Sequence, residues 1–231
     1  MRTVWSVADV LEWLRGHASA KVLDDMGPRY GIHTDLAIGV SMADMKRLGK
    51  QIGVDHGLAL ELWDTGWYEA RTIAAMIDDA SAVTSEQMDA WCAAFDNWAI
   101  CDTVCFNLFD RTEHAWQKLD QWAESTSEFV KRAAFALLWS LALHDKQAAD
   151  DRFGHGLSLI EGHVADDRHL VSKSMSMAMR AVAHRNHALA TAVTELAGRL
   201  ATSESKTARS IGALHLREQR KKVSGSAKLS P

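Results

Sequence analysis

Trp98 and Asp102 have side chains that could do chemistry, and their spacing would bring them together. They lie four positions apart in the segment NWAICD, which on a helix puts an indole and a carboxylate one turn apart on the same face. An aromatic group beside an acid can form an active site. A core tryptophan with an aspartate that caps or pairs nearby is the alternative. The pair would gain a function if its surface also held cations, because a carboxylate facing DNA phosphates is otherwise unfavourable.

Arg132 and Arg180 could supply those cations. Each lies in the middle of an apolar helical run, KRAAFALLWSLAL and SMSMAMRAVAHR. Because arginine is seldom buried without a partner, each is either tied to a carboxylate within the protein or exposed on the inner surface of a curved array, where it binds an anion. Lys131, Lys173 and Arg185 would extend this cationic strip.

The charge is distributed unevenly along the chain. Residues 165–231 hold 12 Lys or Arg and 5 Asp or Glu, a balance of +7; the whole chain has 26 and 30, so 14 and 25 remain for residues 1–164, a balance of −11. A basic C-terminal third can present a positive face to a polyanion even in an acidic protein. A solvated helix face with a basic tail is the alternative.

The elements that must position these residues are helices. Apolar residues recur at three and four positions nearly everywhere, and no strand pattern is evident. Ser41 and Asp55 begin helices, and Thr84 followed by Gln87 predicts a capping box. The predicted helices cover 4–14, 42–52, a segment from 55, 69–77, a segment from 84 to 95, 99–109, 112–123, 127–143, 147–163, 167–184, 187–201 and 204–221.

These helices predict a repeat architecture. The segments EFVKRAAFALL at 128–138 and HLVSKSMSMAMR at 169–180 share an apolar and basic pattern about 40 residues apart, the period of HEAT-type two-helix units. We therefore predict an all-α fold, an α-α superhelix (solenoid) of HEAT-like two-helix repeats, with a compact bundle as the alternative. One repeat domain is expected over 1–221, followed by a flexible basic tail over 222–231.

Composition and motifs exclude several classes of function. Apolar residues make up 47% of the 231 residues, enough for a core, and neither a membrane span nor a secretory signal is evident, so we expect a cytoplasmic protein. The three cysteines predict packed thiols rather than disulfides or a metal site. No Gly-rich phosphate loop and no G-x-S-x-G motif occurs, and we predict neither a cofactor nor a metal.

The chain resembles the AlkD-type DNA alkylation repair family, HEAT-like-repeat glycosylases that remove N3- and N7-alkylated purines. The resemblance runs from about residue 28 to 200. It rests on five segments in the family's order and approximate spacing: RYGIHTDLAIGVSMADMKRLGKQI, DHGLALELWDTGWYEAR, FDNWAICDTVC, EFVKRAAFALLWSLALHDK and KSMSMAMRAVAHRN.

The resemblance implies roles for single residues. Asp102 is similar to the family's catalytic carboxylate and Trp98 to the tryptophan one turn before it. Tyr30, Arg132 and Arg180 resemble family residues at the DNA, and we expect Lys131 and Lys173 to bind DNA beside them.

The implied activity is that of a monofunctional alkylpurine DNA glycosylase in base excision repair, acting on double-stranded DNA without an obligate protein partner. The resemblance also implies that the lesion need not enter a deep pocket. Met177 stands where the family commonly has a second tryptophan. The alternative is therefore a non-catalytic helical-repeat module that binds nucleic acid structures or a protein partner.

Overall fold

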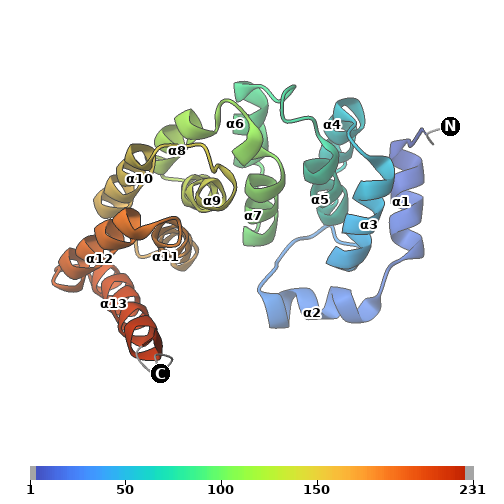
Figure 1. Ribbon diagram of the computed structural model, residues 1–231. Helices are drawn as coiled ribbons and strands as arrows, with labels where there is room; N and C mark the ends of the chain where they lie inside the picture. The colour runs from blue at the N-terminus through green and yellow to red at the C-terminus, as the bar shows by residue number, and fades with distance from the viewer. Residues whose placement is uncertain (1–3, 227–231) are drawn as a thin grey trace. The chain divides into compact units, whose positions relative to one another are not determined.

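The described part of the chain folds into helices joined by short loops. The computed structural model describes the backbone of residues 4–226 and the side chains of residues 4–219, and within this part it contains thirteen α-helices, one short 3-10 helix and no strand (Figure 1). The predicted all-α class is confirmed. None of the described helices is both long and apolar enough to cross a bilayer.

Contacts group the residues into two compact units, Met1–Ala115 and Trp116–Pro231, which we describe separately. The single domain over 1–221 stays a prediction. In the first unit α3, α5 and α7 pack in a row, α4 packs on α5, and α1 contacts both α4 and α5. The helices of this unit are α1 (Val7–Gly16), α2 (Ala20–Tyr30), α3 (Met42–Ile52), α4 (His56–Asp64), α5 (Tyr68–Ile77), α6 (Ser85–Ala93), α7 (Trp98–Asn107) and the 3-10 helix η1 (Phe109–Arg111).

Three predicted helix starts are confirmed. The side chains of Ser41, Asp55 and Thr84 each accept a hydrogen bond from the backbone amide three residues later. Of the capping box predicted at Thr84, the structure shows this half, whereas the Gln87 side-chain amide donates to the buried Asp78 carboxylate at 2.8 Å. The Gln87 side chain therefore binds Asp78, before the helix, instead of the Thr84 backbone amide that a capping box requires.

Helix α2 is absent from the predicted helices. It contains Pro28 in its last turn directly after Gly27, and these two residues together are typical of a turn. The helix tolerates them because it ends there: Gly31 has a left-handed conformation (φ 63°), and its amide donates to the Gly27 carbonyl.

A buried carboxylate holds the loop that joins α2 to α3. Glu69, on α5, is fully buried and accepts hydrogen bonds from the backbone amides of Ile38, Gly39 and Val40 at 2.9, 2.7 and 3.3 Å. Burying an unpaired carboxylate would be costly, so these three donors are what makes its position stable. Glu69 thereby fixes where α3 begins relative to α5.

Gly39 is required in this loop for two reasons. Its φ of 88° lies in the region that favours glycine, and a Cβ atom there would lie 2.7 Å from the Ser19 carbonyl oxygen and 2.9 Å from the Leu23 Cβ. The close approach also lets the Ser19 amide donate to the Gly39 carbonyl at 3.0 Å. The start of α2 is therefore anchored to the loop that Glu69 holds.

The second unit packs corresponding helices of successive pairs against each other. α9 packs on α11, α11 on α13, and α10 on α12. Its helices are α8 (Ala115–Ala123), α9 (Glu128–His144), α10 (Asp150–His163), α11 (His169–Ala183), α12 (His187–Ala201) and α13 (Lys206–Ser226). α13 ends at Ser226 rather than at the predicted residue 221, and the rest of the predicted tail, 227–231, lies outside the described residues.

Arginines connect these helices at a constant separation in the sequence. Arg132 on α9 donates to the Leu170 carbonyl on α11 at 2.6 Å, and Arg199 on α12 binds Glu161 on α10 through two hydrogen bonds at 2.7 and 2.8 Å. The partners are 38 residues apart in both cases, close to the predicted period of about 40.

Replacement of Glu69 tests the anchoring of the loop. We expect Glu69→Gln to lower the free energy of unfolding by about 2 kcal/mol, because hydrogen bonds to a charged acceptor contribute roughly 1.5–3 kcal/mol. Denaturant unfolding measures this. Glu61→Gln, at an exposed position of α4, is the matched control and should change stability by less than about 0.5 kcal/mol. Equal stabilities of the two variants would contradict the assignment.

Candidate functional site

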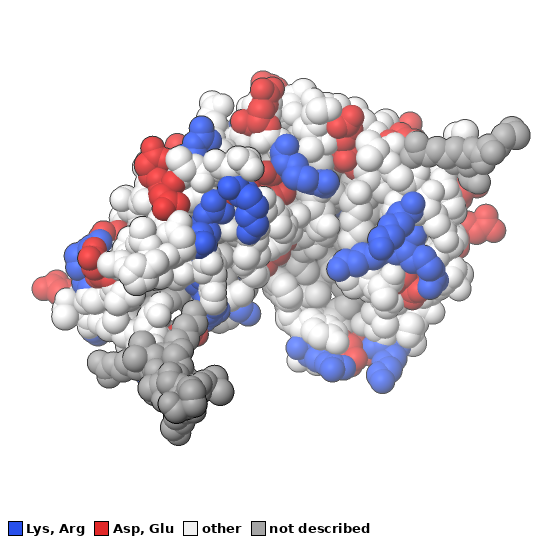
Figure 2. All heavy atoms as spheres, viewed as in Figure 1, with Lys and Arg blue, Asp and Glu red and all other residues white. Residues whose placement is uncertain are grey.

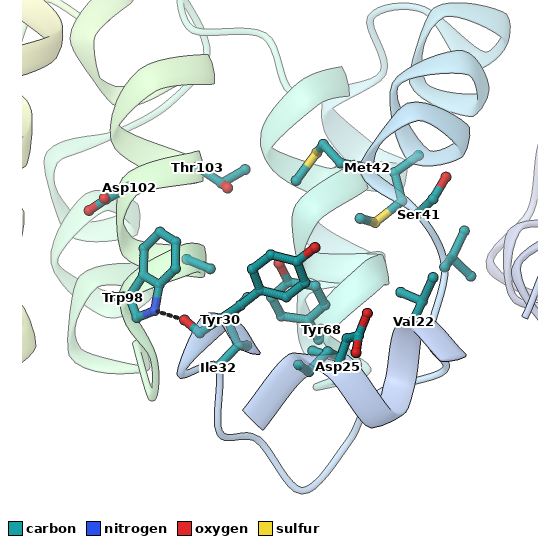
Figure 3. Close-up of a pocket in the computed structure, with 14 residues that line it drawn as sticks. Val22, Asp25, Tyr30, Ile32, Ser41, Met42, Tyr68, Trp98, Asp102 and Thr103 are labelled. Atoms are coloured by element: carbon teal, nitrogen blue, oxygen red, sulfur yellow. Dashed lines mark hydrogen bonds between the residues drawn. The ribbon is translucent and has the colours of Figure 1, made fainter. Parts of the chain in front are cut away.

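Trp98 and Asp102 lie on one face of α7, as predicted. The Asn97 side chain caps the helix by accepting the Ile100 amide at 3.0 Å, and Cys101 points into the core with no exposed surface. Trp98 and Asp102 are both half-buried. In Figure 3 the indole lies between the Asp102 carboxylate and Tyr30.

The structure brings Tyr30 to this face. The Trp98 indole nitrogen donates to the Tyr30 backbone carbonyl at 3.0 Å, which ties the last residue of α2 to the first turn of α7 (Figure 3). The Tyr30 ring is 48% exposed, and the Arg29 guanidinium lies 5.2 Å from its centroid. Tyr30, Trp98 and Asp102 thus form one group within the first unit.

A pocket of about 360 Å³ opens beside this group. Three aromatic side chains line it together with aliphatic side chains and thioethers, and a few polar groups complete the lining (Figure 3). The lining residues are Val22, Asp25, Met26, Tyr30, Ile32, Val40, Ser41, Met42, Met45, Tyr68, Trp98, Ala99, Asp102 and Thr103.

Tyr68 was missed from the sequence although it lines this pocket. Burial, together with the nearby Glu69 charge, raises the pKa of Tyr68 to about 12, so its hydroxyl stays protonated at neutral pH. No motif in the sequence marks Tyr68; the chain has two tyrosines, Tyr30 and Tyr68, and both line the pocket.

A second surface missed from the sequence is basic. Lys46, Arg47 and Lys50 are exposed on α3, and Figure 2 shows Lys and Arg side chains gathered over this helix. Arg47 pairs with Asp44 at 2.8 Å, but its side chain remains 53% exposed. The run MKRLGK contains the signal, because positions 46 and 50 share a helix face.

Arg132 lies inside the protein rather than on an exposed surface. It is only 3% exposed and donates to the Leu170 carbonyl. The expectation that its guanidinium faces outward to bind an anion is therefore not met in this structure, because the next repeat supplies an acceptor. Lys131 beside it lies 3.6 Å from the Asp166 carboxylate, and its side chain is only 13% exposed.

Arg180 also has a carboxylate partner. Its guanidinium binds Glu218 on α13 through two hydrogen bonds at 3.1 and 2.7 Å, and it contacts the Met177 sulfur at 3.0 Å. The ion pair is about one-third exposed on both sides, so an anion could approach it. Lys173 is exposed on the same helix and, with Met177 and Arg180, lines a groove between α11 and α13.

The predicted site residues therefore fall into two groups. Tyr30, Trp98 and Asp102 lie together in the first unit, and Lys131, Arg132, Lys173 and Arg180 belong to the second. That both groups serve one site stays a prediction.

Asp166 forms ion pairs beside the second group, with Arg168 and with Lys131. A side-chain hydrogen bond from Arg168, opposed by partial burial, lowers its pKa from 3.8 to about 2. Arg168 also donates to the Thr126 carbonyl at 2.7 Å. The pair joins the loops before α9 and α11 and places a carboxylate against Lys131.

The cysteines belong to the core. Cys92, Cys101 and Cys105 are buried thiols that form no disulfide among the described residues, and burial raises the pKa of the Cys105 thiol. Among the described residues, no group of three or more His, Cys, Asp or Glu side chains is arranged to hold a metal ion.

Comparisons with known proteins agree with this architecture. Residues 10–210 match the model of a family described as DNA alkylation repair enzyme. No curated protein matches the sequence. A solved structure described as "a new family of proteins related to the HEAT-like repeat DNA glycosylases with affinity for branched DNA structures" is similar with a TM-score of 0.75 and 20% identity, over 93% of this chain and 95% of that chain. The predicted fold of HEAT-like two-helix repeats is confirmed.

The lowered pKa of Asp166 predicts a pH-dependent contribution to stability. A carboxylate whose pKa is lower in the folded state stabilises the fold above its ordinary pKa of 3.8 and loses this effect as the pH falls toward 2. We expect Asp166→Asn to lower the free energy of unfolding by about 1 kcal/mol at pH 7, a value reduced for solvent screening, and by clearly less at pH 3. Urea unfolding at both pH values, with the exposed Asp167→Asn as control, measures the difference. A constant deficit would refute the ionic origin.

Proposed function

This chain belongs to the DNA alkylation repair enzyme family, and we propose that it is a monofunctional DNA glycosylase that excises N3- and N7-alkylated purines from duplex DNA. The observation that carries the proposal is the placement of Asp102 and Trp98 on one half-buried face of α7, at the rim of an aromatic pocket.

The chemistry asks little of the protein. An N3- or N7-alkylated purine is cationic, so the bond from the sugar C1′ to the base breaks with its electron pair moving onto the purine ring, which becomes neutral. The carboxylate of Asp102 would stabilise the positive sugar that remains and orient a water molecule. The water oxygen then bonds to C1′ and its proton leaves to solvent. Trp98 strengthens the effect of the carboxylate by excluding water from one side.

The second unit would supply sequence-independent contacts to the DNA backbone. Lys173 is exposed and suited to a phosphate, and Arg180 could exchange Glu218 for one. Arg132 would act by holding α11, since its guanidinium is buried, and Lys131 would add charge beside it. Within the first unit, Lys46 and Lys50 on α3 are exposed and would offer further cations to phosphates. Such contacts position DNA without reading bases.

Non-catalytic binding of branched DNA is the second candidate. It is favoured by the fold shared with a protein described as having affinity for branched DNA structures, and by Met177, which contacts Arg180 where the family commonly has an indole. A thioether still offers apolar contact but has no aromatic face. The cytoplasmic location and the independence from cofactors and protein partners belong to the proposal in both cases.

Asp102→Asn tests the proposed chemistry. The substitution preserves shape and removes the charge, so excision should slow by about 10²–10³, equivalent to roughly 3–4 kcal/mol, with a smaller deficit for the labile N7-methylguanine. Duplex binding should persist or tighten, because repulsion from phosphates falls. Single-turnover excision of N7-methylguanine and N3-methyladenine is the measurement, and Asp64→Asn, at an exposed position of the same unit, is the control.

Two results would overturn the assignment. Equal rates for wild type and Asp102→Asn would remove Asp102 from the reaction. No excision by wild type, combined with tighter binding of a four-way junction than of linear duplex, would support the branched-DNA module, and Met177→Trp would then show whether an indole restores activity.

The salt dependence of duplex binding separates the cations that touch DNA from those that hold the fold. Lys173→Ala should reduce the slope of log K against log salt by about 0.9, the value for one lost phosphate contact. Arg132→Ala should leave the slope unchanged and lower stability, because it removes a buried group that bonds to α11. Lys146→Ala is the control for an exposed lysine outside the strip. A reduced slope for Arg132→Ala would show that its guanidinium leaves the core to bind phosphate.

A further inference from the structure

Helix α3 carries a cluster of basic side chains that the proposed chemistry at Asp102 does not use. Residues 1–115 contain 9 Lys or Arg and 18 Asp or Glu, a balance of −9, so the first unit as a whole repels polyanions. Three of the nine cations, Lys46, Arg47 and Lys50, nevertheless lie within five residues. Figure 2 shows Lys and Arg side chains gathered over this helix. We call Lys46, Arg47 and Lys50 the α3 basic surface.

The α3 basic surface is accessible and keeps a net positive charge. Lys46 and Lys50 are exposed one helical turn apart, and neither pairs with a carboxylate in the described part of the chain. Arg47 pairs with Asp44 at 2.8 Å and lies 5.5 Å from a ring centroid of Trp13, yet its side chain is still 53% exposed. With the one negative charge of Asp44, the surface keeps a balance of +2.

The surroundings of these cations favour phosphates over a protein partner. Lys46 and Lys50 line both of two shallow hollows, of about 380 and 390 Å³. The first hollow has no aromatic or large aliphatic side chain in its lining, and the second has only Val54 and Met76. Protein interfaces need a more apolar centre than this, whereas exposed lysines suit sequence-independent contacts with the DNA backbone.

The α3 basic surface faces a different direction from the site at Asp102. Met42 and Met45 of α3 line the pocket beside Asp102, whereas none of the three cations does. With 3.6 residues per turn, the middle of the basic surface lies about 120° around the helix from the middle of the flank that holds Met42 and Met45. Phosphates bound to the α3 basic surface therefore approach α3 from another side than a strand at Trp98 and Asp102.

We propose that the α3 basic surface binds the phosphate backbone of a second DNA segment, separate from the segment whose sugar reaches Asp102. The inference rests on the DNA binding that both candidate functions share, and it adds a second surface with its partner. Duplex DNA is stiff, with a persistence length of about 150 base pairs, so a short straight duplex cannot follow two flanks that diverge by about 120°. A branched molecule sends its arms in different directions and can reach both.

The salt dependence of binding tests this proposal. The probes are a four-way junction and an undamaged linear duplex, each titrated by fluorescence anisotropy at several salt concentrations. For the junction, we expect the double variant Lys46→Ala, Lys50→Ala to reduce the slope of log K against log salt by about 1.8, since each of two lost phosphate contacts contributes about 0.9. The slope for the linear duplex should stay as in wild type.

Two further double variants serve as controls. Arg15→Ala, Lys21→Ala removes the same charge from exposed positions of α1 and α2 outside the α3 basic surface, and it should leave both slopes unchanged. Lys46→Arg, Lys50→Arg keeps the charge and should also behave as wild type, which separates a loss of cations from a loss of the lysine side chains themselves. Circular dichroism confirms that all variants are folded.

The outcomes separate this proposal from the glycosylase. An equal loss of slope on both DNAs would show that the α3 basic surface binds the same duplex as the site at Asp102, and would overturn the second segment. An unchanged slope for the junction, or equal affinity of wild type for junction and duplex, would overturn it as well. Excision of N7-methylguanine from linear duplex should be normal in Lys46→Ala, Lys50→Ala. Absence of excision by wild type would overturn the glycosylase, and the binding data would then decide the second segment by themselves.

Discussion

The first unit depends on one buried carboxylate. Glu69 accepts three consecutive backbone amides from the loop before α3, and that loop in turn holds the start of α2 through Gly39. The other end of α2 is held by the hydrogen bond from Trp98 to Tyr30. Helix α2 is therefore held at both ends. Its residues line one side of the pocket beside Asp102, and residues of α7 line another side. Tyr68, the neighbour of Glu69 in the chain, lines the same pocket. The first turn of α5 therefore holds the loop between α2 and α3 and also contributes to the pocket lining.

The second unit solves a different problem, that of joining repeats that cannot bury their apolar faces alone. Corresponding helices pack together, and arginines bridge them at intervals of one repeat. Arg132, Arg180 and Arg199 each reach a partner 38 residues away. The same residue type that binds phosphate well is therefore used here to hold helices in register. Arg180 is intermediate, because its pair with Glu218 is partly exposed and a phosphate could replace the carboxylate.

Local patterns predicted the local features of this molecule. Side-chain caps marked the starts of α3, α4 and α6, and the spacing of Trp98 and Asp102 predicted their shared face. Features that depend on distant partners were not visible in this way. The sequence pattern left open whether Arg132 faces a partner or an anion, because the acceptor is a backbone carbonyl one repeat away. Helix α2 was not predicted because hydrogen bonds to other segments hold its two ends, whereas the Gly27–Pro28 pair within it is typical of a turn.

The concentration of both tyrosines in one pocket has a spectroscopic consequence. One ring is half exposed and the other buried, and both line the same space. Fluorotyrosine incorporated throughout the protein would therefore give two fluorine resonances, each reporting from the pocket and neither from the second unit. Line broadening confined to the Tyr30 resonance would reveal motion of α2. A shift of both resonances would report that a molecule has entered the pocket that the two tyrosines line. The two tyrosines thus allow both labels to be placed without any substitution in the sequence, in the pocket that Asp102 also lines.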